Sequence, residues 1–321
     1  MSNFLVVDAH CDVITKIMST DEELYSNTRH FDLQRAKSHK SFVQFFAAYI
    51  SPDYYPNKAY QRCMDIIKTY KVQIEKNKEH VMPIMKYEQI DTAINQGKIA
   101  AILTIENGAA LEGDINKLDE FYELGVRSIG LTWNGSNQIA CGVGGDNLNG
   151  GLTPFGAEVV TRMNKLGILI DVSHINETSF WDVINTSGAP IIASHSNAKK
   201  LCPHQRNLTN DQFSALIKNN GVTGINLFPL FLNESGIADI NDILNHIEHF
   251  MGLGGENNVG IGADFDGISS TPKGIHGVEC LGKIFEALLS KNYTEEQVKK
   301  IAGLNFLRVL KQTLLGYSDF Y

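Results

Sequence analysis

Short apolar runs recur eight times along the chain, and helical or loop segments separate them. The runs cover residues 4–7, 42–50, 99–105, 126–132, 168–172, 190–193, 222–227 and 259–263. Several are apolar throughout, which is typical of parallel strands buried on both faces. Eight strand–helix units in 321 residues predict an α/β fold, a single (β/α)8 TIM-type barrel domain spanning residues 1–321. A doubly wound open sheet is the alternative.

The segments between these runs carry helix signals. Apolar residues recur at helical spacing in 57–78, and helices are also predicted at 115–124, 154–166, 177–185 and 239–251. Capping boxes at Thr209/Gln212 and Thr294/Gln297 begin two more, the last reaching about residue 315. Residues 15–40 are interpreted as a loop with short helical pieces. The glycine-rich stretch 142–151 lacks the lysine of a phosphate-binding loop and is interpreted as a flexible loop over a site.

Composition excludes several function classes. The net charge is −8 and no basic run occurs, which argues against nucleic acid and anionic membrane surfaces as partners. Five widely spaced cysteines without a C-x-x-C motif argue against a disulfide framework and fit a reducing compartment. Only three residues precede the first apolar run, and no run has the length of a membrane span. We therefore expect a soluble, cytoplasmic protein.

Polar residues with metal-binding or catalytic chemistry follow most of the predicted strands. They are His10 and Asp12, Glu106, Trp133 and Asn134, His174, His195, and Asp264 with Asp266. His10 and Asp12 are two apart, so both side chains leave the same face of an extended chain. In a (β/α)8 barrel the carboxyl ends of the strands form one face, which is where the chemistry of this fold lies. We expect these side chains to meet there.

Five of these residues predict a metal site: His10, Asp12, Glu106, His174 and His195. Nitrogen and oxygen ligands without a thiolate suit zinc, and also manganese, cobalt or iron. Five ligands exceed what one catalytic zinc needs if it keeps an open position. Two metal ions sharing Glu106 as a bridge would use all five. Such a pair would hold a hydroxide as nucleophile and polarise a carbonyl or phosphoryl oxygen.

The sequence resembles the membrane (renal) dipeptidase family, zinc peptidases with a metal-dependent-hydrolase barrel. The matching fragments occur in family order across nearly the whole chain. They are DAHCD at 8–12, IENG at 105–108, GLTPFG at 151–156, DVSH at 171–174, SHS at 194–196 with Arg206-Asn207, GADFDG at 262–267 and NFLRV at 305–309. Together these fragments are specific, although each alone is weak.

The resemblance implies a site with two zinc ions per chain. His10, Asp12 and Glu106 would hold one ion, and His174, His195 and Glu106 the other. Arg206 would bind the terminal carboxylate of the substrate, a task for which its planar fork is suited. Asp264 would handle the proton or the substrate amine near the scissile bond. Without the family, a surface salt bridge for Arg206 and a helix N-cap for Asp264 would be preferred; Asp266 is a candidate for orienting a histidine.

Two positions depart from the family pattern. Trp133 stands where the family has a histidine that helps to bind the scissile carbonyl oxygen, and a tryptophan offers one N–H donor but no titratable group. Asn134 or a metal ion could therefore take over that contact. Phe231 stands where the mammalian enzymes have a tyrosine. The signal peptide and lipid-anchor tail of those enzymes are not expected here.

Three hypotheses follow. The first is a cytoplasmic dinuclear zinc dipeptidase, with a dipeptide as its small-molecule partner and a homodimer suggested by the family. The second keeps the barrel and the metals but changes the substrate to a non-dipeptide amide or lactone, because of Trp133. The third is a binding module with a structural metal.

Other candidate residues are given structural roles. His246 and His249 lie three apart on a predicted helix and are interpreted as a solvated face. Ser194 and Ser196 lack a nucleophile elbow, which argues against a serine hydrolase. Cys11 is interpreted as a packing residue.

Overall fold

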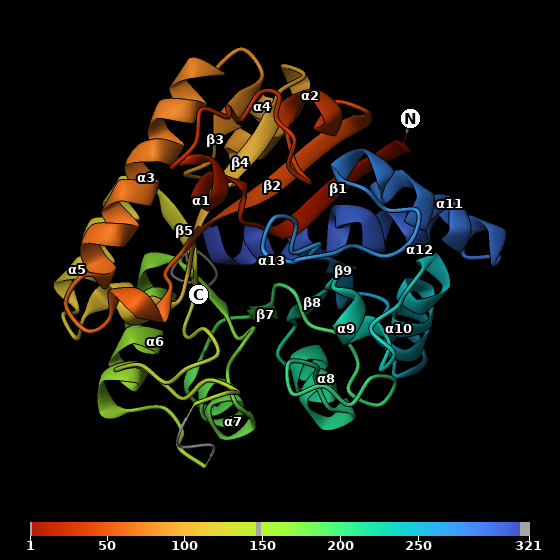
Figure 1. Cartoon of the computed structure of the whole chain (residues 1–321). Coiled ribbons are helices and arrows are strands. Elements are labelled where there is room, and N and C mark those ends of the chain that lie inside the picture. The colour runs from red at the N-terminus through yellow and green to blue at the C-terminus, as the bar shows by residue number, and fades with distance from the viewer. Residues whose placement is uncertain (1, 146–148, 315–321) are drawn as a thin grey trace.

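Eight parallel strands close into a barrel in the computed structural model, which describes residues 2–145 and 149–314 (Figure 1). The strand order is β2-β1-β9-β8-β7-β6-β5-β4, and β2 pairs with β4 to complete the ring. The strands are β1 (Ser2–Cys11), β2 (His39–Tyr49), β4 (Ile99–Glu106), β5 (Val126–Gly130), β6 (Leu169–Asp171), β7 (Ile191–Ala193), β8 (Val222–Ile225) and β9 (Val259–Ile261). The predicted (β/α)8 barrel is confirmed.

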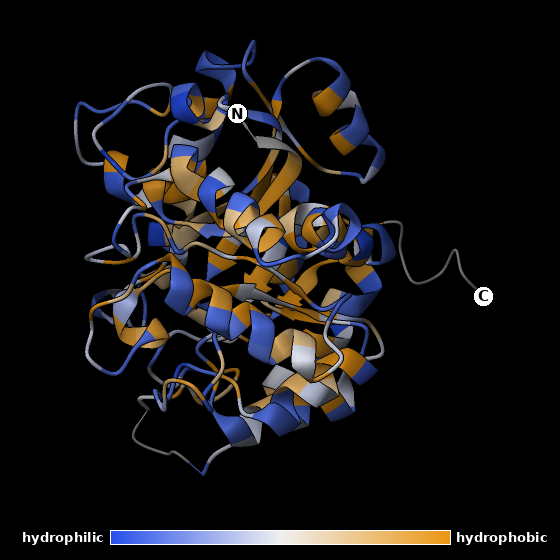
Figure 2. Cartoon of the chain, turned by 90° about the vertical axis from the view of Figure 1, so that its right-hand side faces the viewer, coloured by the Kyte–Doolittle hydropathy of each residue, from blue (hydrophilic) through white to orange (hydrophobic). Residues whose placement is uncertain are grey.

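Helices form an outer layer around the barrel (Figure 1). They are α1 (Val13–Ile17), α2 (Leu33–Ala36), α3 (Ala59–Lys76), α4 (Glu88–Asn95), α5 (Asn116–Leu124), α6 (Pro154–Leu166), α7 (Glu177–Thr186), α8 (Asn210–Lys218), α9 (Pro229–Leu232), α10 (Ile240–Gly252), α11 (Leu281–Ser290), α12 (Glu295–Lys299) and α13 (Asn305–Leu314). Hydrophobic colour is concentrated on the strands and on the inner sides of the helices (Figure 2). Among the described residues, no helix combines the length and apolar character that crossing a membrane requires.

Both faces of the strands are buried, as their continuous apolar sequences predict. Along β2, Val43 and Phe45 belong to one apolar cluster, while Phe42 and Phe46 belong to a second. The first cluster fills the barrel and includes Phe306 of α13, whose ring centroid lies 6.2 Å from that of Phe45. The second lies between the strands and the helices. The strands are therefore held from both sides by apolar packing, which fixes their polar ends.

Helix α13 covers the end of the barrel opposite to the site. It contacts β1, β6, β8 and β9. Arg308 of this helix donates hydrogen bonds to the carbonyl oxygens of Asn220 and Asn257, which precede β8 and β9. The amino ends of the strands are therefore closed, and the carboxyl ends are left for chemistry.

Three details differ from the sequence prediction. A short strand, β3 (Val81–Pro83), pairs with the start of β4 and was not predicted, because three residues ending in proline give little strand signal. Helices α4, α9 and α11 were also missed. The predicted last helix is divided by a π-helical segment, Lys300–Leu304, where Gly303 approaches Leu5 and Val7 of β1 closely. Its predicted end at 315, and residues 146–148 of the glycine-rich stretch, lie outside the described residues.

Candidate active site

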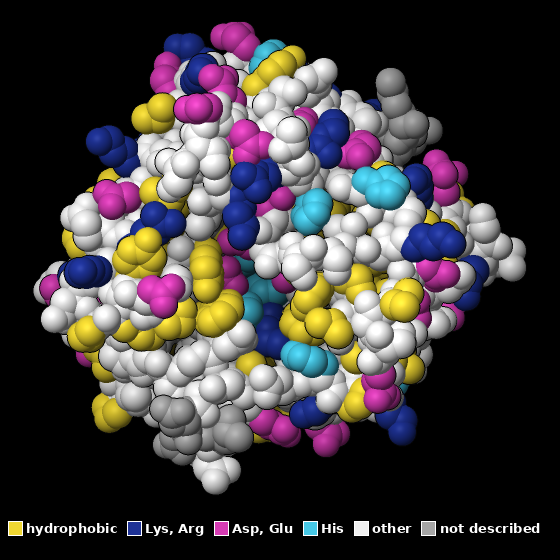
Figure 3. All heavy atoms as spheres, in the orientation of Figure 1, with side chains coloured by type: hydrophobic (Ala, Val, Ile, Leu, Met, Phe, Trp, Pro, Cys, Tyr) yellow, Lys and Arg dark blue, Asp and Glu magenta, His cyan; other side chains and the backbone are white. Residues whose placement is uncertain are grey.

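A pocket with a volume of about 400 Å³ opens at the carboxyl ends of the strands. Figure 3 shows it as a hollow with histidine and acidic side chains at its floor and basic side chains inside it and at its edge. Its lining comes from segments that follow six of the eight barrel strands and from the last residues of the other two, β2 and β4. The lining residues are Asp12, Thr15, Lys16, Tyr49, Glu106, Trp133, Asn134, His174, Arg206, Phe228, Phe231, Asp264, Gly267, Ile268 and Ser269.

The first group of candidate ligands consists of His10, Asp12 and Glu106, and all three are buried. The Nε2 atom of His10 lies 3.3 Å from Asp12 Oδ2 and 3.4 Å from Glu106 Oε2. His10 belongs to β1, Asp12 follows it directly, and Glu106 ends β4. Segments far apart in the sequence thus bring three ligand atoms to one point.

The second group consists of Glu106, His174 and His195, which are also buried. The other oxygen of Glu106, Oε1, lies 2.9 Å from His174 Nε2 and 4.0 Å from His195 Nε2. His174 has a backbone φ of +69°, a left-handed conformation that costs energy in a residue with a Cβ. The two carboxylate oxygens of Glu106 therefore face different histidines, as the predicted bridge requires.

Hydrogen bonds behind the two histidines determine which nitrogen carries the proton. The Ser194 hydroxyl donates to the buried Asp171 carboxylate, so its oxygen accepts from His195 Nδ1–H at 2.7 Å. His174 Nδ1 donates to Asn134 Oδ1 at 2.8 Å. Both Nε2 atoms are therefore left with lone pairs, and they lie 2.9 Å apart. Lone pairs at this distance repel each other. A metal ion bound between the two nitrogens would accept both lone pairs and remove the repulsion, so these residues fit a metal.

Ionisation of the second group agrees with this arrangement. Burial lowers the pKa of His174 to about 3, and the charge of Arg206 acts in the same direction. Burial also lowers the pKa of His195 well below its usual value. Burial alone would raise the pKa of Glu106, but the charge and hydrogen bond of His10 outweigh it and hold this pKa below its usual range. Two neutral imidazoles and a carboxylate are the forms that bind metal ions.

In the first group, the positive charge that a metal ion would supply falls on His10. Burial acts to lower the pKa of His10, but Glu106 and Asp12 outweigh it and raise this pKa well above its usual value. Two buried carboxylates thus gain stability from a positive charge between them. A metal ion would supply that charge more strongly.

Asp264 lies beside both groups. Its carboxylate forms a third potential metal-binding group with His10 and His195, and Oδ2 accepts a hydrogen bond of 2.8 Å from Asn226 Nδ2. Burial raises the pKa of Asp264 to about 7; Asp12 and Glu106 add to this rise, while His10 opposes it. No helix begins at Asp264 in the described chain, so the N-cap interpretation is wrong.

Arg206 is a buried cation in the wall of the pocket. Its side chain is 5% exposed, its Nη2 donates to the backbone oxygen of His195 at 3.3 Å, and its guanidinium lies 5.6 Å from the centroid of the Phe231 ring. Its Nε has no hydrogen-bond partner among the described residues, and it forms no ion pair there. The surface salt-bridge interpretation is therefore wrong. A buried guanidinium facing a cavity is suited to binding a ligand's carboxylate.

Trp133 and Asn134 lie on the β5 side of the pocket. The Trp133 ring makes an edge contact with Tyr49, with centroids 5.5 Å apart, and lies 6.0 Å from the His174 ring. Asn134 is occupied by its bond to His174. Trp133 thus shapes the pocket, while Asn134 orients a candidate ligand.

One sequence interpretation is refined here and another is corrected. Asp266 lies beside a histidine that is not a candidate ligand: its Oδ1 is 3.5 Å from His30 Nδ1, and its carboxylate accepts the backbone N–H groups of His30 and Phe31 at 2.7 and 3.2 Å. It anchors the loop before α2 to the segment after β9. His246 is buried rather than solvated, because its two ring nitrogens bind the backbone of Ala198 and Leu232.

The structure also adds residues that sequence reasoning missed. Asp171 and Ser194 form the hydrogen-bonded support of His195, and Asn226 supports Asp264. Ser194 is adjacent to His195, and Asp171 lies three residues before His174, so their closeness to candidate ligands was the available signal. Lys16 and Tyr49 join the pocket lining without any such signal.

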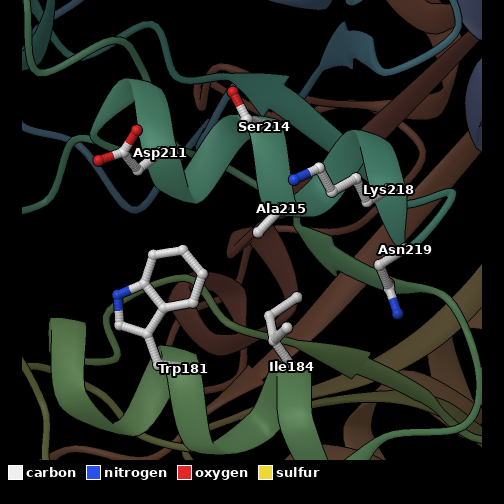
Figure 4. Close-up of a pocket in the computed structure, with 7 residues that line it drawn as sticks. All are labelled: Trp181, Ile184, Asp211, Ser214, Ala215, Lys218 and Asn219. Atoms are coloured by element: carbon white, nitrogen blue, oxygen red, sulfur yellow. The ribbon is translucent and has the colours of Figure 1, made fainter.

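A second hollow lies on the outer surface between α7 and α8 and has a volume of about 470 Å³ (Figure 4). Trp181 and Ile184 of α7 face α8 across it. Its lining includes one carboxylate, Asp211, and neither histidine nor cysteine. It therefore lacks the chemistry found at the barrel mouth.

Comparison with known proteins identifies the same architecture elsewhere. The family model described as membrane dipeptidase (peptidase family M19) matches residues 1–316. An uncharacterized dipeptidase of Schizosaccharomyces pombe is 33% identical over 305 residues, which cover 90% of this chain and 73% of that protein. A Rhodobacter sphaeroides metallopeptidase, crystallised with a phosphinate mimic of the dipeptide L-Ala-D-Ala, has a TM-score of 0.89 and 26% identity, covering 97% of this chain and 99% of its own. Dipeptidase AC, a metallopeptidase of family M19, has a TM-score of 0.88 with the same identity and coverage.

Proposed function

This chain belongs to the membrane dipeptidase family, a family of metal-dependent dipeptidases, and we propose that it cleaves dipeptides with two zinc ions bridged by Glu106. The position of Glu106 carries the proposal, because its Oε2 faces His10 and its Oε1 faces His174. His10 and Asp12 would complete one zinc site, and His174 and His195 the other. All of these ligands contribute nitrogen or oxygen atoms, which suits zinc.

When bound, the metal ions would activate a water molecule and polarise the peptide carbonyl. The protein's own residues would position the substrate. Arg206 would pair with the terminal carboxylate, which explains a buried guanidinium with an unpartnered Nε. Asp264, whose pKa is about 7, would take a proton from the attacking water and give it to the leaving amine.

A D-residue at the second position of the substrate is part of the proposal. The Rhodobacter metallopeptidase binds a phosphinate mimic of L-Ala-D-Ala, and it shares the fold over almost the whole chain. A phosphinate is tetrahedral at phosphorus, so it imitates the carbonyl carbon after attack rather than before it. We therefore expect this chain to hydrolyse L-Ala-D-Ala as well as L-Ala-L-Ala.

The test measures amino-acid release from L-L and L-D dipeptides by metal-stripped enzyme with and without added zinc. Zinc-dependent cleavage is expected, and the metal content should be two per chain. Glu106→Gln should abolish turnover and weaken binding of at least one metal, since an amide loses the bridging charge. Full activity of this variant with intact metal content would overturn the assignment.

The presence of Trp133 in place of the family's histidine favours one alternative function, that of a related amidohydrolase acting on a non-dipeptide amide or lactone. Its bulk narrows the pocket beside His174. Turnover of N-acyl amino acids or lactones, without dipeptide cleavage, would support this alternative. Trp133→His should then increase dipeptide cleavage markedly. The cytoplasmic location and the homodimer stay predictions.

A further inference from the structure

Lys16 places a positive charge at the edge of the pocket. It lies in α1, directly after β1, and is exposed while also lining the cavity. It forms no ion pair within residues 2–145 and 149–314. The hydroxyl-bearing Thr15 and Ser269 line the same pocket. A solvent-accessible ammonium that forms no ion pair among the described residues is available to bind an anionic group of a ligand.

The order of strands separates Lys16 from Arg206. Arg206 follows β7, whereas Lys16 follows β1, and β8 and β9 lie between these strands in the ring. Glu106 and its histidines occupy the floor of the pocket. A dipeptide with its terminal carboxylate on Arg206 and its peptide bond above Glu106 would extend its first residue towards β1 and β2. The two cations would therefore meet different ends of the substrate.

We propose that Lys16 binds the side-chain carboxylate of an acidic first residue, so that dipeptides beginning with L-Glu or L-Asp are preferred substrates. This assignment rests on the proposed dipeptidase function and names its substrate class. The length and flexibility of lysine suit contact with a carboxylate held on a side chain. The exposure of Lys16 makes the preference modest and sensitive to salt.

A second role for Lys16 makes a different prediction. Burial and the charge of Glu106 raise the pKa of Asp12 to about 6, and Lys16 acts in the opposite direction. If Lys16 only supported the charge of Asp12, its removal would slow all dipeptides by the same factor. The ratio between acidic and neutral substrates therefore separates the two roles.

The experiment compares kcat/KM for L-Glu-L-Ala, L-Gln-L-Ala, L-Lys-L-Ala, L-Ala-L-Glu and L-Ala-L-Ala with the zinc-loaded enzyme. We expect about a fivefold preference for L-Glu-L-Ala over its neutral isostere L-Gln-L-Ala at low salt, falling as salt increases. Lys16→Met should remove this preference, and Lys16→Glu should reverse it in favour of L-Lys-L-Ala. Lys68→Met, an exposed lysine on α3, is the matched control and should change nothing.

The outcomes distinguish the two levels of the proposal. Failure to cleave any dipeptide in the panel would overturn the proposed function. Cleavage of L-Ala-L-Ala with an unchanged Glu-to-Gln ratio in Lys16→Met would overturn only the role of Lys16. If Lys16→Met lowered kcat/KM for L-Ala-L-Glu rather than for L-Glu-L-Ala, the role of Lys16 would also be overturned, because the contact would then lie at the second residue.

Discussion

Buried histidines occur in two settings in this molecule, and they differ in how their nitrogens are used. His246 of α10 and His195 after β7 are each 1% exposed. His246 accepts the Ala198 N–H at Nδ1 and donates to the Leu232 oxygen at Nε2, both at 3.0 Å. His195 donates from Nδ1 to the side-chain hydroxyl of Ser194, while its Nε2 faces His174 Nε2 and Glu106. Burial therefore does not distinguish a structural histidine from a candidate ligand, but a lone pair directed at other ligand atoms does.

The largest expected effect tests the ligand side of this comparison. His195→Ala should reduce dipeptide turnover roughly a thousandfold, equivalent to about 4 kcal/mol of barrier, because one metal loses a ligand. Metal content should fall in parallel, as measured by elemental analysis. The metal-free variant should be as stable as the metal-free wild type, since a repulsive contact disappears. Normal metal binding in the variant would place His195 with the structural histidines.

The second prediction tests the structural side. His246→Leu should lower the free energy of unfolding by about 2–4 kcal/mol, because a backbone N–H and a backbone oxygen lose their partners in the interior. Metal content of the folded variant should stay at the wild-type value. His249→Leu is the control, since its ring is only partly buried and binds one side chain, Asn210. Equal losses in the two variants would contradict the importance of the buried backbone contacts.

A smaller effect is expected from the residue that supports His195. Ser194→Ala removes the acceptor of Nδ1–H and should weaken zinc binding by about 10- to 100-fold, or about 1.4–2.7 kcal/mol. The measurement is competition with a chelator of known affinity. Ser196→Ala, on the other side of His195 and equally buried, is the matched control. An unchanged zinc affinity for Ser194→Ala would show that packing alone orients the ring.

The same comparison explains which parts of the fold and of the candidate site could be predicted from the sequence. Continuous apolar runs predicted the strands, and the residues that follow them, such as Glu106 and His174, predicted the site, because parallel strands must end on one face. The sequence did not distinguish His246 from a solvated histidine, since its partners are backbone groups of distant segments. For the same reason, the sequence did not show that the histidine beside Asp266 is His30 rather than a candidate ligand. The pocket position of Lys16 depends on loop geometry, which no periodic pattern encodes.

The smallest expected effect is on the pH dependence of stability, and it tests the structural role of His246 independently of the metal site. Burial lowers the pKa of His246 below its usual value of 6.5, and the hydrogen bond to Leu232 only partly offsets this. The unfolded chain therefore binds more protons at this position, so the stabilising contribution is present above about pH 6.5 and is lost as the pH falls below it. Unfolding of metal-free protein by urea between pH 5 and 8 should show wild-type stability falling towards pH 5. His246→Leu should show a shallower fall, because it lacks this proton uptake. Parallel curves for the two proteins would mean that the ring is protonated as readily in the fold as in the unfolded chain.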